Sequence, residues 1–193
     1  MRTLKPLVLL VILGLAAPAG ACLTSLEPLY TEKDLILDPA LEGQWSDGGT
    51  TLTLTLTNTE EKSYEAVFAS NPETGQKPQK FLAHLVKLKK VLFLDLFPQP
   101  EKNEASGFLQ SHLVPFHSFA RLKLEGDALE LAWMDYSWFE KMIKEKKIRI
   151  AHQVLADDRI VVTADTKRLQ KFALKYASNP DAYPNPWTLQ RKK

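Results

Sequence analysis

Cysteine is almost absent from this sequence. Cys22 is the only one, so no disulfide can form within the chain, and the small secreted domains that depend on such bridges are excluded. Glycine is also sparse, with eight residues, and no Gly-rich loop has the spacing that holds phosphate groups. The histidines show no spacing typical of a zinc site: they are His84, His112, His117 and His152. We therefore expect neither a metal nor a cofactor.

Excess charge is lacking as well. The chain has 25 basic and 23 acidic side chains, and two of the basic ones, Arg2 and Lys5, lie in the first 21 residues, which contain no acid. The rest of the chain is therefore electrically neutral. A neutral chain has no basic footprint for nucleic acid, so we expect no nucleic-acid partner. Its length suits one domain with a core of its own.

The longest apolar run is too short to cross a membrane as a helix. Leu7 to Ala17 would span about 16 Å, whereas the hydrocarbon core of a bilayer is about 30 Å thick. Basic residues precede this run and small residues follow it at 19–21, which is the three-part pattern of a secretory signal. We predict a signal peptide over residues 1–21, cleaved after Ala21.

Cys22 directly follows this cleavage point, where a bacterial lipoprotein carries the cysteine that receives lipid. Ala19 stands where such lipoproteins more often have leucine, and two alternatives stay open: an ordinary signal cleaved elsewhere, or a short anchor helix. We expect acyl chains such as palmitate on Cys22 to hold the protein to a membrane of the cell envelope. Leu23 replaces the aspartate of retained lipoproteins, which by resemblance implies the outer membrane, facing the periplasm, in a two-membrane bacterium.

Most of the chain has the pattern of β-strands. Residues 51–57 alternate threonine with leucine, so one strand face is apolar and the other polar. Further strands are predicted at 63–69, 79–88, 91–96, 112–124, 127–134, 148–155 and 159–164. Short turns separate several of them, which is typical of an antiparallel meander. We expect residues 22–30 to be a tether and 31–193 to form one domain.

Two helices interrupt or end this meander. Ser137 and Glu140 have the spacing of a capping box and predict a helix over 137–146, inserted before the last two strands. Thr166 is expected to cap a second helix near the C-terminus. A sheet of about eight strands hides its edges most simply by closing, so the predicted fold is mainly β, a lipocalin-like barrel; a two-sheet sandwich is the alternative.

Gly43 and Trp45 at the first predicted strand, followed by a meander and a late helix, resemble the lipocalin and calycin barrels. The chain lacks the second lipocalin motif and adds the helix at 137–146. It is more similar to a group of uncharacterised bacterial envelope lipoproteins. That resemblance rests on the pieces 38–45, 81–85, 94–98, 117–121 and 166–172. It implies a barrel fold and brings no assigned activity.

The turn at Lys89-Lys90 sets a register in which His84 and Asp95 are direct cross-strand neighbours. Such a pair satisfies its own polarity among apolar groups, and three interpretations stay open: a structural pair, an anchor for the polar head of a ligand, or a catalytic dyad. No activated nucleophile is evident, so we do not expect an enzyme. Ser118 is a nominal third member with nothing to place it.

His117, Phe119 and Arg121 follow one another at every second position, so all three should share one strand face. Arg121 is expected to cover Trp45 by a cation–π contact, as a basic residue does in lipocalin-like barrels. The candidate ligand-binding residues are therefore His84, Asp95, His117 and Arg121.

Two functions from different classes follow from this pattern. The first is a lipid-anchored module whose barrel binds an apolar small molecule or lipid. The second is a non-catalytic structural subunit with a filled barrel that binds another envelope protein. An accessible apolar cavity of about 300 Å³ or more favours the first, and a filled interior favours the second.

Overall fold

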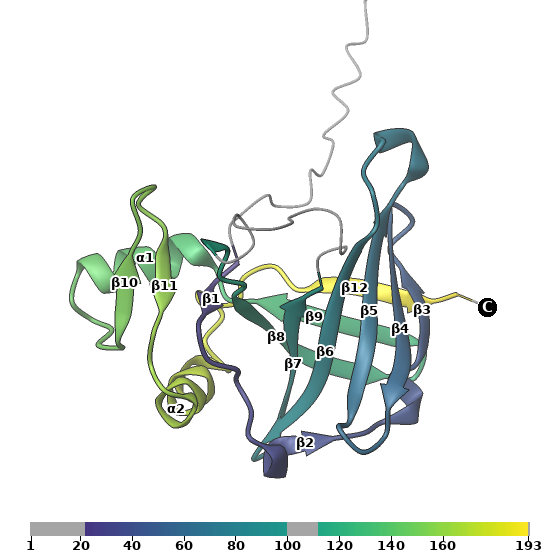
Figure 1. Ribbon diagram of the computed structural model, residues 1–193, viewed down its shortest axis with the longest axis horizontal. Helices are drawn as coiled ribbons and strands as arrows, with labels where there is room; N and C mark the ends of the chain where they lie inside the picture. Colours follow the sequence, from purple (N-terminus) through teal and green to yellow (C-terminus); the bar gives the residue numbers. More distant parts are fainter. Residues whose placement is uncertain (1–21, 100–111, 193) are drawn as a thin grey trace, which may run out of the picture.

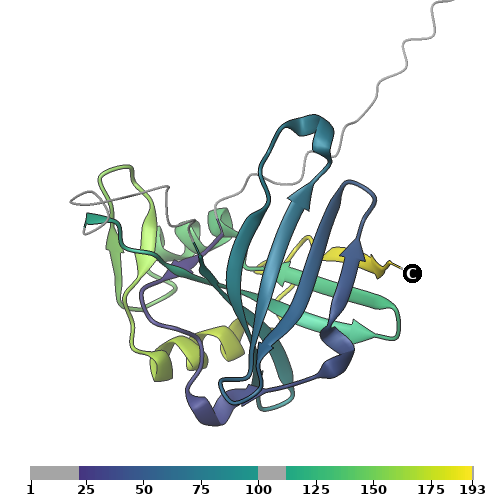
Figure 2. The same ribbon diagram turned by 45° about the vertical axis from the view of Figure 1, so that its right-hand side comes forward.

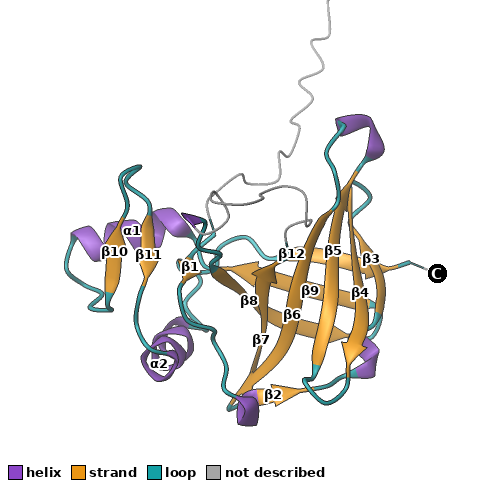
Figure 3. Cartoon of the chain, viewed as in Figure 1, coloured by secondary structure: helices purple, strands orange, loops and turns teal. Residues whose placement is uncertain are grey.

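The computed structural model describes residues 22–99 and 112–192 (Figure 1). The predicted signal peptide and its cleavage point at Ala21 lie outside the described residues. The fold is mainly β and contains a closed antiparallel barrel with two helices, as the sequence predicts (Figure 3).

Eight strands form the ring of the barrel. Each is hydrogen-bonded to its two neighbours, and the ring closes where β9 pairs with both β8 and the C-terminal strand β12. In ring order the strands are β3 (Gly43–Ser46), β4 (Thr50–Asn58), β5 (Ser63–Ser70), β6 (Gln79–Leu88), β7 (Val91–Pro98), β8 (His117–Glu125), β9 (Ala128–Trp133) and β12 (Trp187–Arg191).

The strand that closes the barrel is not among the predicted ones. β12 follows a proline-rich stretch at the C-terminus and inserts between β3 and β9. The strands predicted at 148–155 and 159–164 exist as β10 (His152–Val154) and β11 (Ile160–Val162), but they form a hairpin outside the ring. Five residues beside proline give too short an alternation to reveal a barrel strand, although the inward Leu189 is fully buried.

The structure confirms the local patterns within the ring. Leu52 and Leu54 of β4 point into the barrel and are buried, as their alternation with threonine predicts. The turn between β6 and β7 has Lys89 in the left-handed region (φ 55°) and pairs Leu88 with Val91, which is the predicted register.

A lobe packs against the outer wall of the barrel (Figures 1 and 2). It contains α1 (Tyr136–Lys144), α2 (Thr166–Tyr176) and the β10–β11 hairpin. β1 (Thr24–Ser25) joins the hairpin to the barrel, because it pairs with β11 in parallel and with β8 in antiparallel orientation. The described part of the chain therefore has one apolar core inside the ring and another between the wall of the ring and the lobe.

An aspartate caps each helix, in place of the residue that the sequence predicts: the caps lie two residues before Ser137 and one residue before Thr166. Asp135, and not Ser137, caps α1, because its carboxylate accepts a hydrogen bond from the N–H of Trp138. Asp165 caps α2 in the same way. Thr166 instead donates its hydroxyl hydrogen to the carbonyl of Pro28, which ties α2 to the N-terminal segment.

The segment expected to be a tether is packed onto the barrel. Leu23 and Leu29 are buried, and Ser25 is fully buried within β1. The chain then continues through a short 3-10 helix (Glu32–Asp34), β2 (Leu35–Ile36), which pairs with β6, and a second 3-10 helix (Pro39–Leu41). A third 3-10 helix (Pro72–Thr74) lies between β5 and β6.

Candidate functional site

Side chains fill the interior of the barrel. Trp45 and Tyr64 are 0% and 1% exposed, and the remaining members are mostly leucines. The inward-facing residues are Leu41, Trp45, Leu52, Leu54, Tyr64, Ala66, Ala83, Leu85, Leu94, Leu96, Ala120, Leu122, Leu129, Leu131 and Leu189. Small eight-stranded barrels are just wide enough to be filled in this way, so the interior is a core.

Aromatic side chains close one end of the barrel. Phe68 packs edge-on against Phe81 at a centroid distance of 5.5 Å, and Trp187 lies 6.2 Å from Phe68 and 6.1 Å from Trp133. Trp187 is held in place by a 2.8 Å hydrogen bond from its Nε1 to Asp47. These four rings come from β5, β6, β9 and β12, and they block access to the interior from this end.

Arg191, and not Arg121, covers Trp45 at the other end. Its guanidinium lies 4.1 Å from the ring centroid, while the Trp45 Nε1 donates to the carbonyl of Leu41 at 3.0 Å. Arg121 points to the outer face, where it stacks 5.2 Å from the centre of the Tyr183 ring and donates to Ala177. The predicted contact was therefore right about the tryptophan and wrong about its cation.

Gly43 makes room for this arginine. Its φ of +127° is a conformation that residues with a side chain rarely adopt, and a Cβ atom there would lie 2.7 Å from Nη1 of Arg191. Arg191 also donates to the carbonyls of Glu42 and Ala40. The Gly43 and Trp45 pair thus helps to close this end of the barrel.

The structure confirms the predicted pairing of His84 with Asp95, but on the outer wall of the barrel. Both residues alternate with the inward Leu85 and Leu94, so they face the lobe together with Phe93. Asp95 is 0% exposed. The pair therefore cannot anchor a ligand inside the ring.

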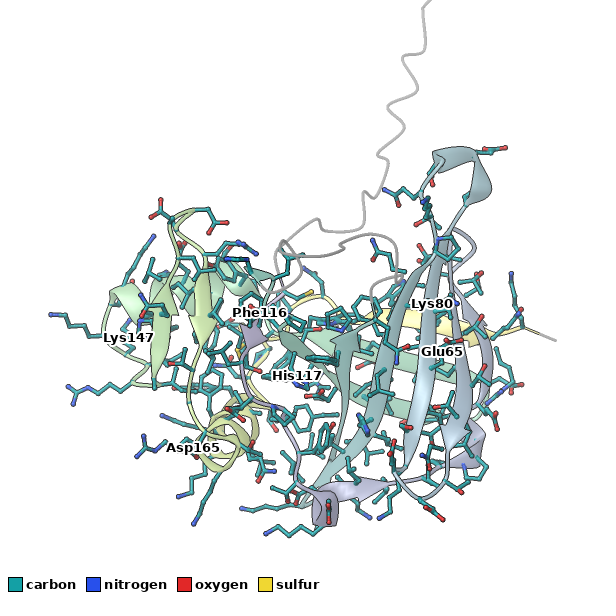
Figure 4. All side chains as sticks on the ribbon, viewed as in Figure 1. Glu65, Lys80, Phe116, His117, Lys147 and Asp165 are labelled. Carbon is teal, nitrogen blue, oxygen red and sulfur yellow. The ribbon has the colours of Figure 1, made fainter. Side chains whose placement is uncertain are left out.

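The hydrogen-bond partners of Asp95 are His117 and the N-terminal segment. Nδ1 of His117 lies 2.7 Å from Oδ1 of Asp95, and the backbone N–H of Leu29 donates to Oδ2 at 2.9 Å. Because a carboxylate accepts, Nδ1 of His117 carries the hydrogen. Figure 4 shows His117 between the barrel wall and the lobe. Asp95 thus joins two strands of the wall to the strap formed by residues 23–30.

His84 packs beside this pair without joining it. Its ring lies 4.5 Å from that of Tyr30, and its buried Nδ1 has no hydrogen-bond partner among the described residues. Burial lowers the pKa of His84, and the opposing influence of Asp95 is smaller. Burial, with the nearby negative charges of Asp95 and Glu61, raises the pKa of Tyr30 to about 12. Both rings are therefore neutral near pH 7.

The two serines beside this cluster do not hydrogen-bond to His117. Ser25 lies opposite His117 in the β1–β8 register, but its hydroxyl donates to the carbonyl of Glu27 at 2.7 Å. Ser118 has its side chain on the other face of β8 from His117. Within residues 22–99 and 112–192 no serine or cysteine is hydrogen-bonded to a histidine that could activate it. The geometry fits a structural latch.

Among the described residues, hollows outside the ring include the following two. The first, of about 430 Å³, lies at the barrel rim beside the start of the described chain, and its lining includes Cys22, Phe81, Val114, Phe116, Tyr136 and Ile160. The second, of about 370 Å³, lies between residues 148–151 and α2. The sequence prediction missed the second hollow, because the basic run 141–149 reads as a solvated helix face until α2 is placed beside it.

The described residues contain no group of histidine, cysteine, aspartate or glutamate side chains that could hold a metal ion. None of the helices in this part of the chain has the length and apolar character needed to span a bilayer. Comparisons of the chain with protein-family models, with curated proteins and with solved structures found no match.

Proposed function

We propose that this chain is a lipid-anchored protein of the bacterial envelope that acts as a non-catalytic interaction module. The observation that carries the proposal is the filled barrel, whose interior is packed with leucines and whose ends are covered by Trp187 and Trp45 with their neighbours. A carrier of small molecules needs a cavity that its ligand can enter. The interior of this barrel is instead packed with side chains, so we assign the barrel the role of a scaffold that holds the lobe and the outer surface in place.

The position of Cys22 supports anchoring close to the barrel. Only Leu23 separates it from β1, and Leu23 is buried, so lipid on Cys22 would hold the barrel rim against the bilayer. Leu113 and Val114 are 57% and 60% exposed, and Val114 lines the same hollow as Cys22. Apolar side chains beside a lipid attachment point suit the interface of a membrane.

Metabolic labelling tests the anchor. Cells that express the full chain and are fed an alkyne analogue of palmitate should label the protein, and Cys22→Ser should abolish the label and release the protein from the membrane fraction. Leu113→Ser is the matched control, because it changes the neighbouring surface and leaves the thiol in place. A Cys22→Ser protein that still carries the label would refute lipidation at this residue.

Native mass spectrometry and crosslinking test the interaction role. The chain extracted from its host should carry no stoichiometric small molecule, and photo-crosslinkers on the exposed face of the lobe should capture one partner protein reproducibly. An apolar ligand bound at one per chain would instead favour the carrier. A chain that gives no crosslinks from any face would contradict the interaction role.

A further inference from the structure

The second hollow is lined by cations on two sides. Arg168, Lys171 and Lys175 lie on α2 at a spacing that places them along one side of the helix. Arg149 contributes a fourth cation from the opposite wall. No acidic side chain of the described residues lines the hollow.

The surrounding lobe carries an unbalanced charge. Residues 136–176 contain ten basic and five acidic side chains, although the chain after residue 21 is neutral as a whole. Four of the acids, Glu140, Glu145, Asp157 and Asp165, are each within 4 Å of a basic group of the lobe. Of the four cations in the hollow, only Arg168 has such a partner among the described residues. The hollow therefore presents a net positive field.

The floor of the hollow is apolar. Ile148 and Phe172 are buried, while Ile150 and Tyr176 are partly buried and pack against the core between the barrel and the lobe. A ligand that carried only charge would leave this floor unused. A ligand that alternates apolar and acidic groups would match both the floor and the rim.

Residues 148–151 also contain backbone N–H groups without a protein partner among the described residues. These residues belong to no helix or strand, and the N–H groups of Arg149, Ile150 and Ala151 have no protein partner in the described part of the chain. The carbonyls of a bound peptide can accept hydrogen bonds from such groups. A polyphosphate could pair with the cations, but it has no apolar groups to pack on the floor of the hollow. Donors, cations and an apolar floor together select the chemistry of an acidic peptide.

We infer that the hollow between residues 148–151 and α2 binds an amphipathic acidic segment of a partner protein. The carboxylates of the segment pair with Arg149, Lys171 and Lys175, and its apolar side chains pack on the floor. The hollow belongs to the lobe, because all of its lining residues lie between positions 148 and 176. This inference rests on the interaction role proposed above and adds the site and the chemistry of the partner.

A fluorescent peptide in which glutamate alternates with leucine tests the inference, with the full chain purified in detergent. The peptide with glutamine in place of glutamate should bind at least about tenfold more weakly, a difference of about 1.4 kcal/mol. The double variant Arg149→Glu with Lys171→Glu should lose about tenfold in affinity for the acidic peptide. Lys87→Glu with Lys167→Glu is the matched control, because it makes the same charge change at exposed sites that do not line the hollow.

Equal losses of peptide affinity in the two double variants would overturn the inference, since the overall positive charge of the protein would then explain the binding. Equal affinity for the two peptides would also overturn it. If inorganic polyphosphate binds as tightly as the acidic peptide and shows the same sensitivity to Lys171→Glu, the hollow is a phosphate site. If the partner crosslinked in cells is unchanged in the Arg149→Glu, Lys171→Glu variant, the interaction role stands and this site for it is refuted.

Discussion

Replacing Asp95 by alanine is the sharpest test of how this chain is held together. The carboxylate is fully buried and accepts hydrogen bonds from His117 Nδ1 at 2.7 Å and from the Leu29 N–H at 2.9 Å. In Asp95→Ala both donors stay buried and lose their acceptor. Each buried donor without a partner costs about 1–3 kcal/mol, so the loss of the acceptor for both donors costs about 2–6 kcal/mol.

We therefore expect Asp95→Ala to lower the free energy of unfolding by about 2–6 kcal/mol, out of the roughly 5–15 kcal/mol typical of a domain. Asp95→Asn should lose only about 1–2 kcal/mol, because its amide oxygen can still accept from Leu29. Glu125→Ala, an exposed carboxylate at the end of β8, is the control and should change little.

Urea unfolding followed by tryptophan fluorescence measures these differences, and amide hydrogen exchange locates them. Exchange at Leu29 should accelerate most in Asp95→Ala, because the strap of residues 23–30 loses its central hydrogen bond. A loss in stability below about 1 kcal/mol, or unchanged exchange at Leu29, would refute the interpretation of Asp95 as the latch of the strap.

Three further changes test other parts of the fold. Burial holds the pKa of His84 below its usual value, so protonation favours the unfolded chain. The free energy of unfolding should therefore fall as the pH drops below about 6.5. Urea unfolding at about pH 7 and pH 5 measures this loss, which should be smaller in His84→Leu. Gly43→Ala should lower the free energy of unfolding by about 1–3 kcal/mol, measured by thermal melts, because of the positive φ and the close contact of the new Cβ with Arg191. Adding Arg191→Ala should remove the contact and leave the strain of the positive φ. Leu189→Ala should cost about 2–5 kcal/mol, because the side chain is fully buried in the strand that closes the ring; an unchanged melting temperature would contradict that closure.

Local sequence determined most strands of the ring and the register between β6 and β7. The alternation at 51–57 needs no distant partner to mark a strand, and the two-residue turn at Lys89-Lys90 aligns His84 with Asp95 through chain connectivity alone. The antiparallel barrel follows from the same reasoning, because many short strands joined by tight turns must pair with their neighbours and hide their edges.

The tertiary structure decided which face of each strand lies inside. On β6 both faces are apolar, with Ala83 and Leu85 on one and Val86 and Leu88 on the other, and both are buried. Alternation cannot separate inside from outside when a lobe covers the outer wall. The sequence therefore predicted the register of Asp95 correctly. It did not predict that the strap and the lobe surround this residue.

The sequence likewise did not predict the contacts between segments that lie far apart along the chain. Arg191 finds Trp45 only because β12 returns to pair with β3, and α2 completes the basic hollow only because it packs beside residues 148–151. Period and turn chemistry act over a few residues, whereas burial depends on what the whole chain places nearby. Local physics therefore determined the elements, and long-range packing determined which surfaces this protein hides and which it offers to a partner.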